Sequence, residues 1–366
     1  MLTRGGSVTV PAAPSLQFSN LSSWEDTVCF IRMSEIVVVD MVSERSSRIS
    51  LPKFQLYQAV LVTVKKTMYV AVASNQGLQI WSPDGNSMLF FCALSEIAPS
   101  SVDQDGQFMR GITFTSTHIA VGTSFGVVAV FDTTGSEVAL LDRISVDSIV
   151  ANAPRKSTTH ATTAHAITVM TSSPRMFFGG NEDGEVFAFA LDNAPNGSDK
   201  RRGACLEAMA KFPPAVLGTP VTAMCADQES TADIVYAGFA DGHIRIYRTQ
   251  IQEMSIEICA HVRAVTGLAA VPTIGCLVSC AEDQFFQAWR LPDFVNGKAF
   301  PSAASDFVAS EGYLVFSEKI DNRLCTGLAA LGGSGAGGGS GKGKGGPVRV
   351  AVASYDDDCL VVFQGK

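Results

Sequence analysis

Residues 261–289 read HVRAVTGLAAVPTIGCLVSCAEDQFFQAW, and four of them decide the fold. His261, Ser279, Asp283 and Trp289 are separated by 18, 4 and 6 positions, and apolar, β-prone runs lie between them. A buried aspartate needs hydrogen-bond donors, which an imidazole N–H and the backbone of a tight turn can supply. We therefore expect the four residues to form a structural network that fastens the turn at Asp283 to the loop before the first strand.

A catalytic site is a second interpretation of these residues, because His, Asp and Ser can also form a catalytic triad. That interpretation leaves Trp289 unexplained, whereas a network within a repeated hairpin accounts for all four residues. The five histidines are scattered and no Cys-x-x-Cys pair occurs. A glycine-rich run resembles a phosphate-binding loop, but Gly345 follows Lys344 where Ser or Thr is required. We predict no catalytic, cofactor-binding or metal-binding residues, no cofactor, and no enzyme activity.

The hairpin around Asp283 is one of seven similar copies. Each copy has an apolar run, a tight turn and a second apolar run, and the turn often contains Asp-Gly or a relative. Asp and Gly tolerate the positive φ of tight hairpins, so this pattern is a strong hairpin signal. The copy from Thr27 to Asp40 is the weakest. The second runs end 42, 50, 58, 58, 42 and 74 positions apart, at Val39, Trp81, Phe131, Phe189, Tyr247, Trp289 and Phe363.

These spacings predict the fold class. The shortest steps match the roughly 40 to 45 residues of a WD-repeat blade, and longer steps need inserted loops. We predict an all-β chain with residues 1–366 in one closed, seven-bladed WD-repeat β-propeller. A basic loop at 192–203 and a Gly-rich loop at 332–346 should be flexible insertions. The N-terminal strand Ser7–Val10 should complete the last blade, because this pairing removes two free sheet edges.

In these hairpins and in the residues around Asp283, the chain resembles the WD repeat-containing protein 54 family, from about Asn20 to Phe363. The resemblance implies a propeller with no assigned catalytic residues and an intracellular role in protein association, but it does not fix a partner. The Gly-rich stretch and the basic loop around Arg201 depart from the family pattern. The closest segments are Arg110-Gly111-Ile112, Val121-Gly122-Thr123, Val130-Phe131-Asp132, Ala260-His261, Glu282-Asp283 and Trp289-Arg290-Leu291.

Composition limits the class of partner. The net charge of −8 gives no reason to expect specific nucleic-acid binding. Apolar runs stop long before the roughly 20 residues of a membrane-spanning helix, so no membrane insertion is expected. The N-terminus lacks the apolar core of a secretory signal, and the nine cysteines suit reduced core thiols. We therefore expect a cytoplasmic protein, with the cytoskeleton or cilium as candidate sites of association.

The predicted function is that of a non-catalytic scaffold for protein–protein interactions within an intracellular assembly. One alternative is a substrate-recognition adaptor of a ubiquitin ligase, although Arg290 follows Trp289 where the Trp-Asp-x-Arg docking signature needs Asp. Another is a propeller hydrolase, which would need acids or histidines at the central channel. Loops on rigid scaffolds concentrate binding residues. For the face with the tight turns we predict a protein-binding set of Gln76, Phe125, Glu182, Phe239, Glu282 and Tyr355.

Overall fold

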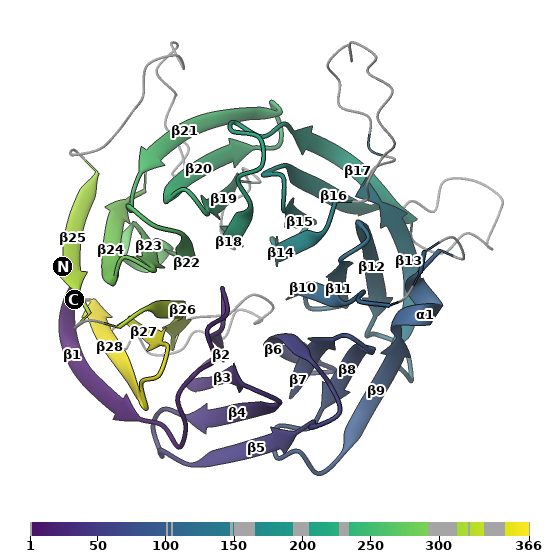
Figure 1. Cartoon of the computed structure of the whole chain (residues 1–366), viewed down its shortest axis with the longest axis horizontal. Helices are drawn as coiled ribbons and strands as arrows, with labels where there is room; N and C mark the ends of the chain where they lie inside the picture. Colours follow the sequence, from purple (N-terminus) through teal and green to yellow (C-terminus); the bar gives the residue numbers. More distant parts are fainter. Residues whose placement is uncertain are drawn as a thin grey trace.

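Seven four-stranded antiparallel sheets surround a central axis in the computed structural model, so the predicted closed, seven-bladed propeller is confirmed (Figure 1). The structure describes residues 2–99, 102–103, 105–146, 149, 165–192, 205–226, 234–291, 313–320, 323–332 and 348–365. The innermost strands of the blades are β2 (Ser22–Trp24), β6 (Leu56–Val64), β10 (Met109–Phe114), β14 (Ile167–Ser172), β18 (Val221–Ala226), β22 (Val265–Val271) and β26 (Cys325–Leu331).

The seven predicted hairpins are the second and third strands of the seven blades. The second strands are β3 (Thr27–Arg32), β7 (Thr67–Ser74), β11 (His118–Thr123), β15 (Met176–Asn181), β19 (Ile234–Phe239), β23 (Cys276–Ala281) and β27 (Arg349–Ser354). The third strands are β4 (Glu35–Asp40), β8 (Gly77–Trp81), β12 (Val127–Asp132), β16 (Val186–Asp192), β20 (His243–Arg248), β24 (Phe285–Arg290) and β28 (Cys359–Gly365).

The outermost strands show how the ring closes. They are β5 (Ser46–Ser50), β9 (Met88–Ala93), β13 (Ala139–Ser145), β17 (Cys205–Phe212), β21 (Glu253–Cys259), β25 (Leu314–Lys319) and, for the last blade, β1 (Leu2–Thr9). β1 pairs antiparallel with β28, from Leu2 opposite Gly365 to Thr9 opposite Cys359. The predicted closing strand is therefore confirmed, and it is longer than the segment inferred from the sequence. The two ends of the chain lie side by side at the rim (Figure 1).

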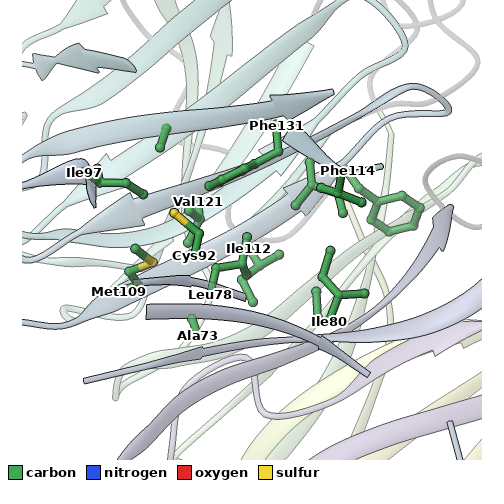
Figure 2. Close-up of a cluster of buried hydrophobic side chains, with 14 of the residues drawn as sticks. Ala73, Leu78, Ile80, Cys92, Ile97, Met109, Ile112, Phe114, Val121 and Phe131 are labelled. Carbon is green, nitrogen blue, oxygen red and sulfur yellow. The ribbon is translucent and has the colours of Figure 1, made fainter. Parts of the chain in front are cut away.

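Hydrophobic side chains fill the spaces between neighbouring blades. The cluster in Figure 2 joins the blade of β6 to the blade of β10 and includes Leu78, Ile112, Val121 and Phe131, all at most 2% exposed. The short helix α1 (Leu94–Ile97) covers one end of this cluster. No helix in the described part of the chain is long and apolar enough to cross a membrane. The two predicted insertions lie outside the described residues, apart from their first residues Asp192 and Gly332.

Threonines tie the innermost strands of neighbouring blades together. The Thr168 hydroxyl donates to the Val221 carbonyl at 2.6 Å, and the Thr222 hydroxyl donates to the Val265 carbonyl at 2.6 Å. Both threonines sit where the register of their strand shifts, at a bulge. A bulge re-aims side chains, and here it turns the hydroxyls toward the next blade.

Glycines on the second strands let the next blade approach. A Cβ added at Gly238 would lie 2.6 Å from Val265 Cγ1, closer than real contacts allow. We expect Gly238→Ala to lower the free energy of unfolding by roughly 1–3 kcal/mol, because overpacking forces the neighbouring blade outward. Gly135→Ala is the matched control, because Gly135 is exposed and has an ordinary φ. Urea denaturation of both variants would measure the difference, and equal stabilities would contradict this packing argument.

Candidate functional site

The strand order places two kinds of connection on one face of the ring. Because strands alternate in direction, the turns between second and third strands emerge on the same face as the links from each outermost strand to the next blade. We call this the tight-turn face. It carries the sequence-predicted network and all six predicted binding residues.

The network at Asp283 is one continuous chain of hydrogen bonds. Trp289 Nε1 donates to Ser279 Oγ at 3.0 Å, and Ser279 Oγ lies 2.8 Å from His261 Nε2. His261 Nδ1 lies 3.0 and 3.1 Å from the two carboxylate oxygens of Asp283. The carboxylate also accepts the Val262 backbone N–H at 3.2 Å, so the network holds the link before β22 against the turn after β23.

Burial decides between the structural and the catalytic interpretation of this network. Ser279 is 0% exposed and Trp289 is 2% exposed. A nucleophile must meet its substrate, and this hydroxyl is covered and already bonded on both sides. The four residues therefore hold a loop in place and leave no group free to react.

The Asp283 carboxyl also makes stability depend on pH. Burial acts to raise its pKa, but hydrogen bonds from His261 and from the backbone at Phe285 and Val262 outweigh that effect and lower it. A lowered carboxyl pKa stabilises the fold above about pH 4, and this stabilisation is lost as pH falls through the folded-state value. We expect Asp283→Asn to flatten the decline in unfolding free energy below about pH 4.

Urea denaturation between pH 7 and pH 3 would measure this dependence. Asp358→Asn is a suitable control, because Asp358 is an exposed turn residue. It should keep the wild-type slope. An unchanged slope in Asp283→Asn would contradict the assignment.

The neighbouring blade uses a buried arginine in place of this network. Arg245 on β20 is 1% exposed and donates to Glu257 at 2.6 Å and to Asp241, in the tight turn, at 3.2 Å. Its guanidinium carbon also lies 4.2 Å from the ring centroid of Phe239. Sequence reasoning missed this arrangement, because Ala237 stands where the serine would be and no histidine precedes β18 at the matching position.

A segment between β1 and β2 crosses the mouth of the central channel on the tight-turn face. The Ser19 backbone N–H donates to Thr266 at 2.8 Å, and its hydroxyl donates to the Thr222 carbonyl at 3.2 Å. Gln17 reaches the Leu56 carbonyl at 3.0 Å, and the Asn20 backbone N–H reaches the Thr326 carbonyl at 3.0 Å. The segment thus contacts residues at or next to the starts of four innermost strands.

The innermost strands contain none of the acids or histidines that the hydrolase alternative names. All seven innermost strands are described, and their sequences contain no Asp, Glu or His. The propeller hydrolase considered from the sequence would need such groups there. The hydrolase alternative is therefore not supported.

Two of the predicted binding residues are corrected by the structure. Phe125 is 5% exposed and belongs to the same buried cluster as Leu94 and Ile97 of α1. Phe239 is 1% exposed and lies under the Arg245 guanidinium. Both rings point into the spaces between blades, so the prediction that they are exposed on the face is wrong.

The other four predicted binding residues do reach solvent. Gln76 and Glu182 are exposed, Glu282 is partly exposed and Tyr355 is 45% exposed. Glu182 also accepts the Ala166 backbone N–H at 3.0 Å, so it helps to hold the adjoining link.

Sequence reasoning missed the most exposed apolar side chains of the tight-turn face. Val262 is 88% exposed and Leu217 is 80% exposed, although each lies a few residues before a buried innermost strand. A signal was available, because both stand in short links bounded by charged residues, proline or glycine, where no strand can bury them. Among the described residues, the exposed large apolar side chains on this face are those of Leu16, Met33, Val216, Leu217, Val262 and Tyr355.

One group on the tight-turn face has the donor types of a metal site. The ligand atoms of Asp357, Asp358 and Cys359 lie within 4.8 Å of one another. Asp357 is 2% exposed, however, and its carboxylate is already paired with the Arg323 guanidinium. Its other oxygen accepts the Cys359 backbone N–H at 3.0 Å. These contacts explain the group as a turn fastened by an ion pair.

Comparisons with known proteins agree with this geometry. A family model described as WDR54 matches residues 201–299. "WD repeat-containing protein 54" of Mus musculus is 27% identical over 222 residues, which cover 61% of this chain and 59% of the relative. The chain is a WD-repeat propeller similar to WD repeat-containing protein 54. The resemblance inferred from the sequence is therefore confirmed.

Further relatives have the same extent of similarity. "WD repeat domain 54" of Rattus norvegicus is 27% identical over 222 residues, and "WD repeat-containing protein 54" of Homo sapiens is 25% identical over 224 residues. The matched region spans 59% of the length of each relative. A chain in the "Crystal Structure of Mitotic Checkpoint Complex" superposes with a TM-score of 0.65 at 11% identity, covering 100% of this chain and 96% of that one. That likeness concerns the fold.

Proposed function

We propose that this propeller is a non-catalytic scaffold that binds another protein through its tight-turn face. Propellers of the WD-repeat class generally serve as interaction platforms. The observation that carries the proposal is the position of Val262. This side chain is 88% exposed, yet its own backbone N–H is bonded to the buried Asp283 carboxylate.

Such a side chain suits recognition for an energetic reason. An apolar group gains free energy when a partner covers it, about 25 cal/mol per Å² of apolar surface. Ordering a loop normally offsets part of that gain. Here the hydrogen-bond network already holds the backbone of Val262 in the free protein, so binding a partner need not order that loop. Exposed apolar side chains at Leu217, Tyr355 and Met33 lie on the same face.

We also propose that the protein works in the cytoplasm. Eight of the nine cysteines, those whose side chains the structure describes, are free thiols. Thiols persist in reducing compartments. An intracellular assembly, with a cytoskeletal or ciliary one as a candidate, is the setting that this proposal favours.

A single charged substitution should test the binding face. We expect Val262→Asp to weaken capture of partner proteins at least about tenfold, because a carboxylate would have to be buried at an apolar contact. Val42→Asp is the matched control. Val42 is 68% exposed and lies between β4 and β5, on the opposite face. Quantitative affinity capture with wild type and both variants gives the answer. Loss of the same partners with Val42→Asp, and their retention with Val262→Asp, would contradict the proposal.

A further inference from the structure

An exposed cysteine, a histidine and an aspartate stand in line on the edge of the blade that contains β20. Cys259 ends β21 and is in register with His243, the first residue of β20. Cys259 Sγ lies 3.3 Å from His243 Nε2. His243 Nδ1 lies 3.2 Å from Asp241 Oδ2, within ion-pair distance, although its alignment is not that of a hydrogen bond. The tight turn and the strand register bring the three together.

The environment of Cys259 differs from those of the seven other cysteines whose side chains the structure describes. Six of them are buried, and burial raises the pKa of the Cys29 thiol to about 12 and that of Cys92 to about 11. Cys359 is partly exposed, but its sulfur lies 3.7 Å from the Asp358 carboxylate and not beside an imidazole. Cys259 combines exposure with an imidazole that can accept its proton.

The Asp241 carboxylate lies on the other side of the imidazole, within ion-pair distance of Nδ1. Its carboxylate also accepts from Arg245, which is itself bonded to Glu257. Burial acts to raise the pKa of Asp241, but the hydrogen bond from the His243 backbone and the charges of Arg245 and His243 outweigh it and lower the value. An ionised carboxylate next to Nδ1 favours a proton there and leaves Nε2 as the acceptor facing the thiol.

We propose that Cys259 is a nucleophilic thiol, served by His243, that forms covalent adducts with α,β-unsaturated carbonyl compounds. The thiol proton passes to His243 Nε2 as Sγ attacks the β-carbon of the ligand. A carbon–sulfur bond forms, the carbon–carbon π bond breaks, and the imidazolium returns the proton to the α-carbon. Atoms and charge balance without an oxidant or a leaving group.

This class of ligand fits what the site provides. Acyl transfer would need preorganised donors for a tetrahedral oxyanion. Among the described residues, the Cys259 side chain makes its only polar contact with the His243 imidazole. Conjugate addition needs only a thiolate and a proton carrier, and both are present. Cys259 lies three residues before Val262, so an adduct would stand at the border of the proposed binding surface, although the chemistry does not depend on that surface.

The rate of alkylation by N-ethylmaleimide, itself an α,β-unsaturated carbonyl compound, tests the proposal. Brief labelling at pH 7 followed by peptide mass spectrometry gives a rate for each cysteine. In wild type we expect Cys259 to react at least about tenfold faster than Cys359. His243→Gln should slow Cys259 about tenfold, because general-base assistance is lost, and should leave Cys359 unchanged. Equal rates at Cys259 in wild type and His243→Gln would overturn the proposal.

Two controls separate reactivity from folding. His165→Gln alters a histidine that faces Asp183 on another blade with similar exposure, and it should leave the rate at Cys259 unchanged. A peptide of residues 253–265 supplies the same thiol without the fold. Wild-type Cys259 should react at least about tenfold faster than this peptide, because only the fold positions the imidazole. Equal rates in the protein and the peptide would overturn the proposal even if His243→Gln failed to fold.

Discussion

Removal of residues 2–9 is expected to lower the thermal midpoint of the propeller by roughly 10 °C, and to make the protein self-associate. The deletion removes β1 and leaves β28 as an open edge in the last blade. It also removes Leu2, which is 4% exposed and packs in the cluster around Phe286 and Phe363. Differential scanning calorimetry and light scattering would measure the two effects.

A peptide of residues 2–9 added in trans is the control for this deletion. Backbone pairing along an open sheet edge is sequence-tolerant, but the side chains of β1 fit the register of β28. The peptide should therefore restore part of the lost thermal midpoint, and a scrambled peptide should restore less. A deletion variant as stable and as monomeric as wild type would contradict the role of β1 in closure.

Ser279→Ala is the second change with a large expected effect. It should lower the free energy of unfolding by about 3 kcal/mol, because it leaves Trp289 Nε1 and His261 Nε2 buried without their shared partner. The change removes a single oxygen, so packing contributes little. Urea denaturation followed by tryptophan fluorescence would measure the loss.

Ser354→Ala is its matched control. Ser354 ends the second strand of another blade and is 1% exposed, but its hydroxyl has no hydrogen-bond partner within the described residues. Its replacement removes a buried hydroxyl that has no such partner, so it should not lower the free energy of unfolding and should raise it by about 1 kcal/mol. Equal losses in the two serine variants would show that burial of the hydroxyl, and not the network, determines the stability.

The elements of the fold could be predicted because the same short pattern appears seven times. Tight turns between β-prone runs located every second and third strand, and most of these turns contain Asp or Gly; the weak copy from Thr27 to Asp40, which turns at Met33-Ser34, contains neither there. Closure could be predicted because a strand-like segment near the N-terminus had no partner of its own and β28 needed one. The hairpins are a local property of the sequence, whereas closure joins strands at opposite ends of the chain and could be inferred only because each had a free edge.

The binding face could be predicted only in outline, because side-chain direction within a turn depends on the next blade. Phe125 and Glu182 occupy comparable turns, yet the first packs beneath α1 and the second reaches solvent. Sequence reasoning also missed the segment around Ser19 that crosses the mouth of the channel. Its contacts to Thr222 and Thr266 join positions about 200 residues or more apart in the sequence, and no periodic pattern encodes them.

Photo-crosslinking from Val262 tests the central claim most directly. A photoreactive amino acid placed at position 262 samples the tight-turn face, and the same group at position 42 samples the opposite face at comparable exposure. The account predicts discrete protein adducts from position 262 in cells, with few or none from position 42. Adducts from position 42 alone would contradict the claim that the tight-turn face is the recognition surface.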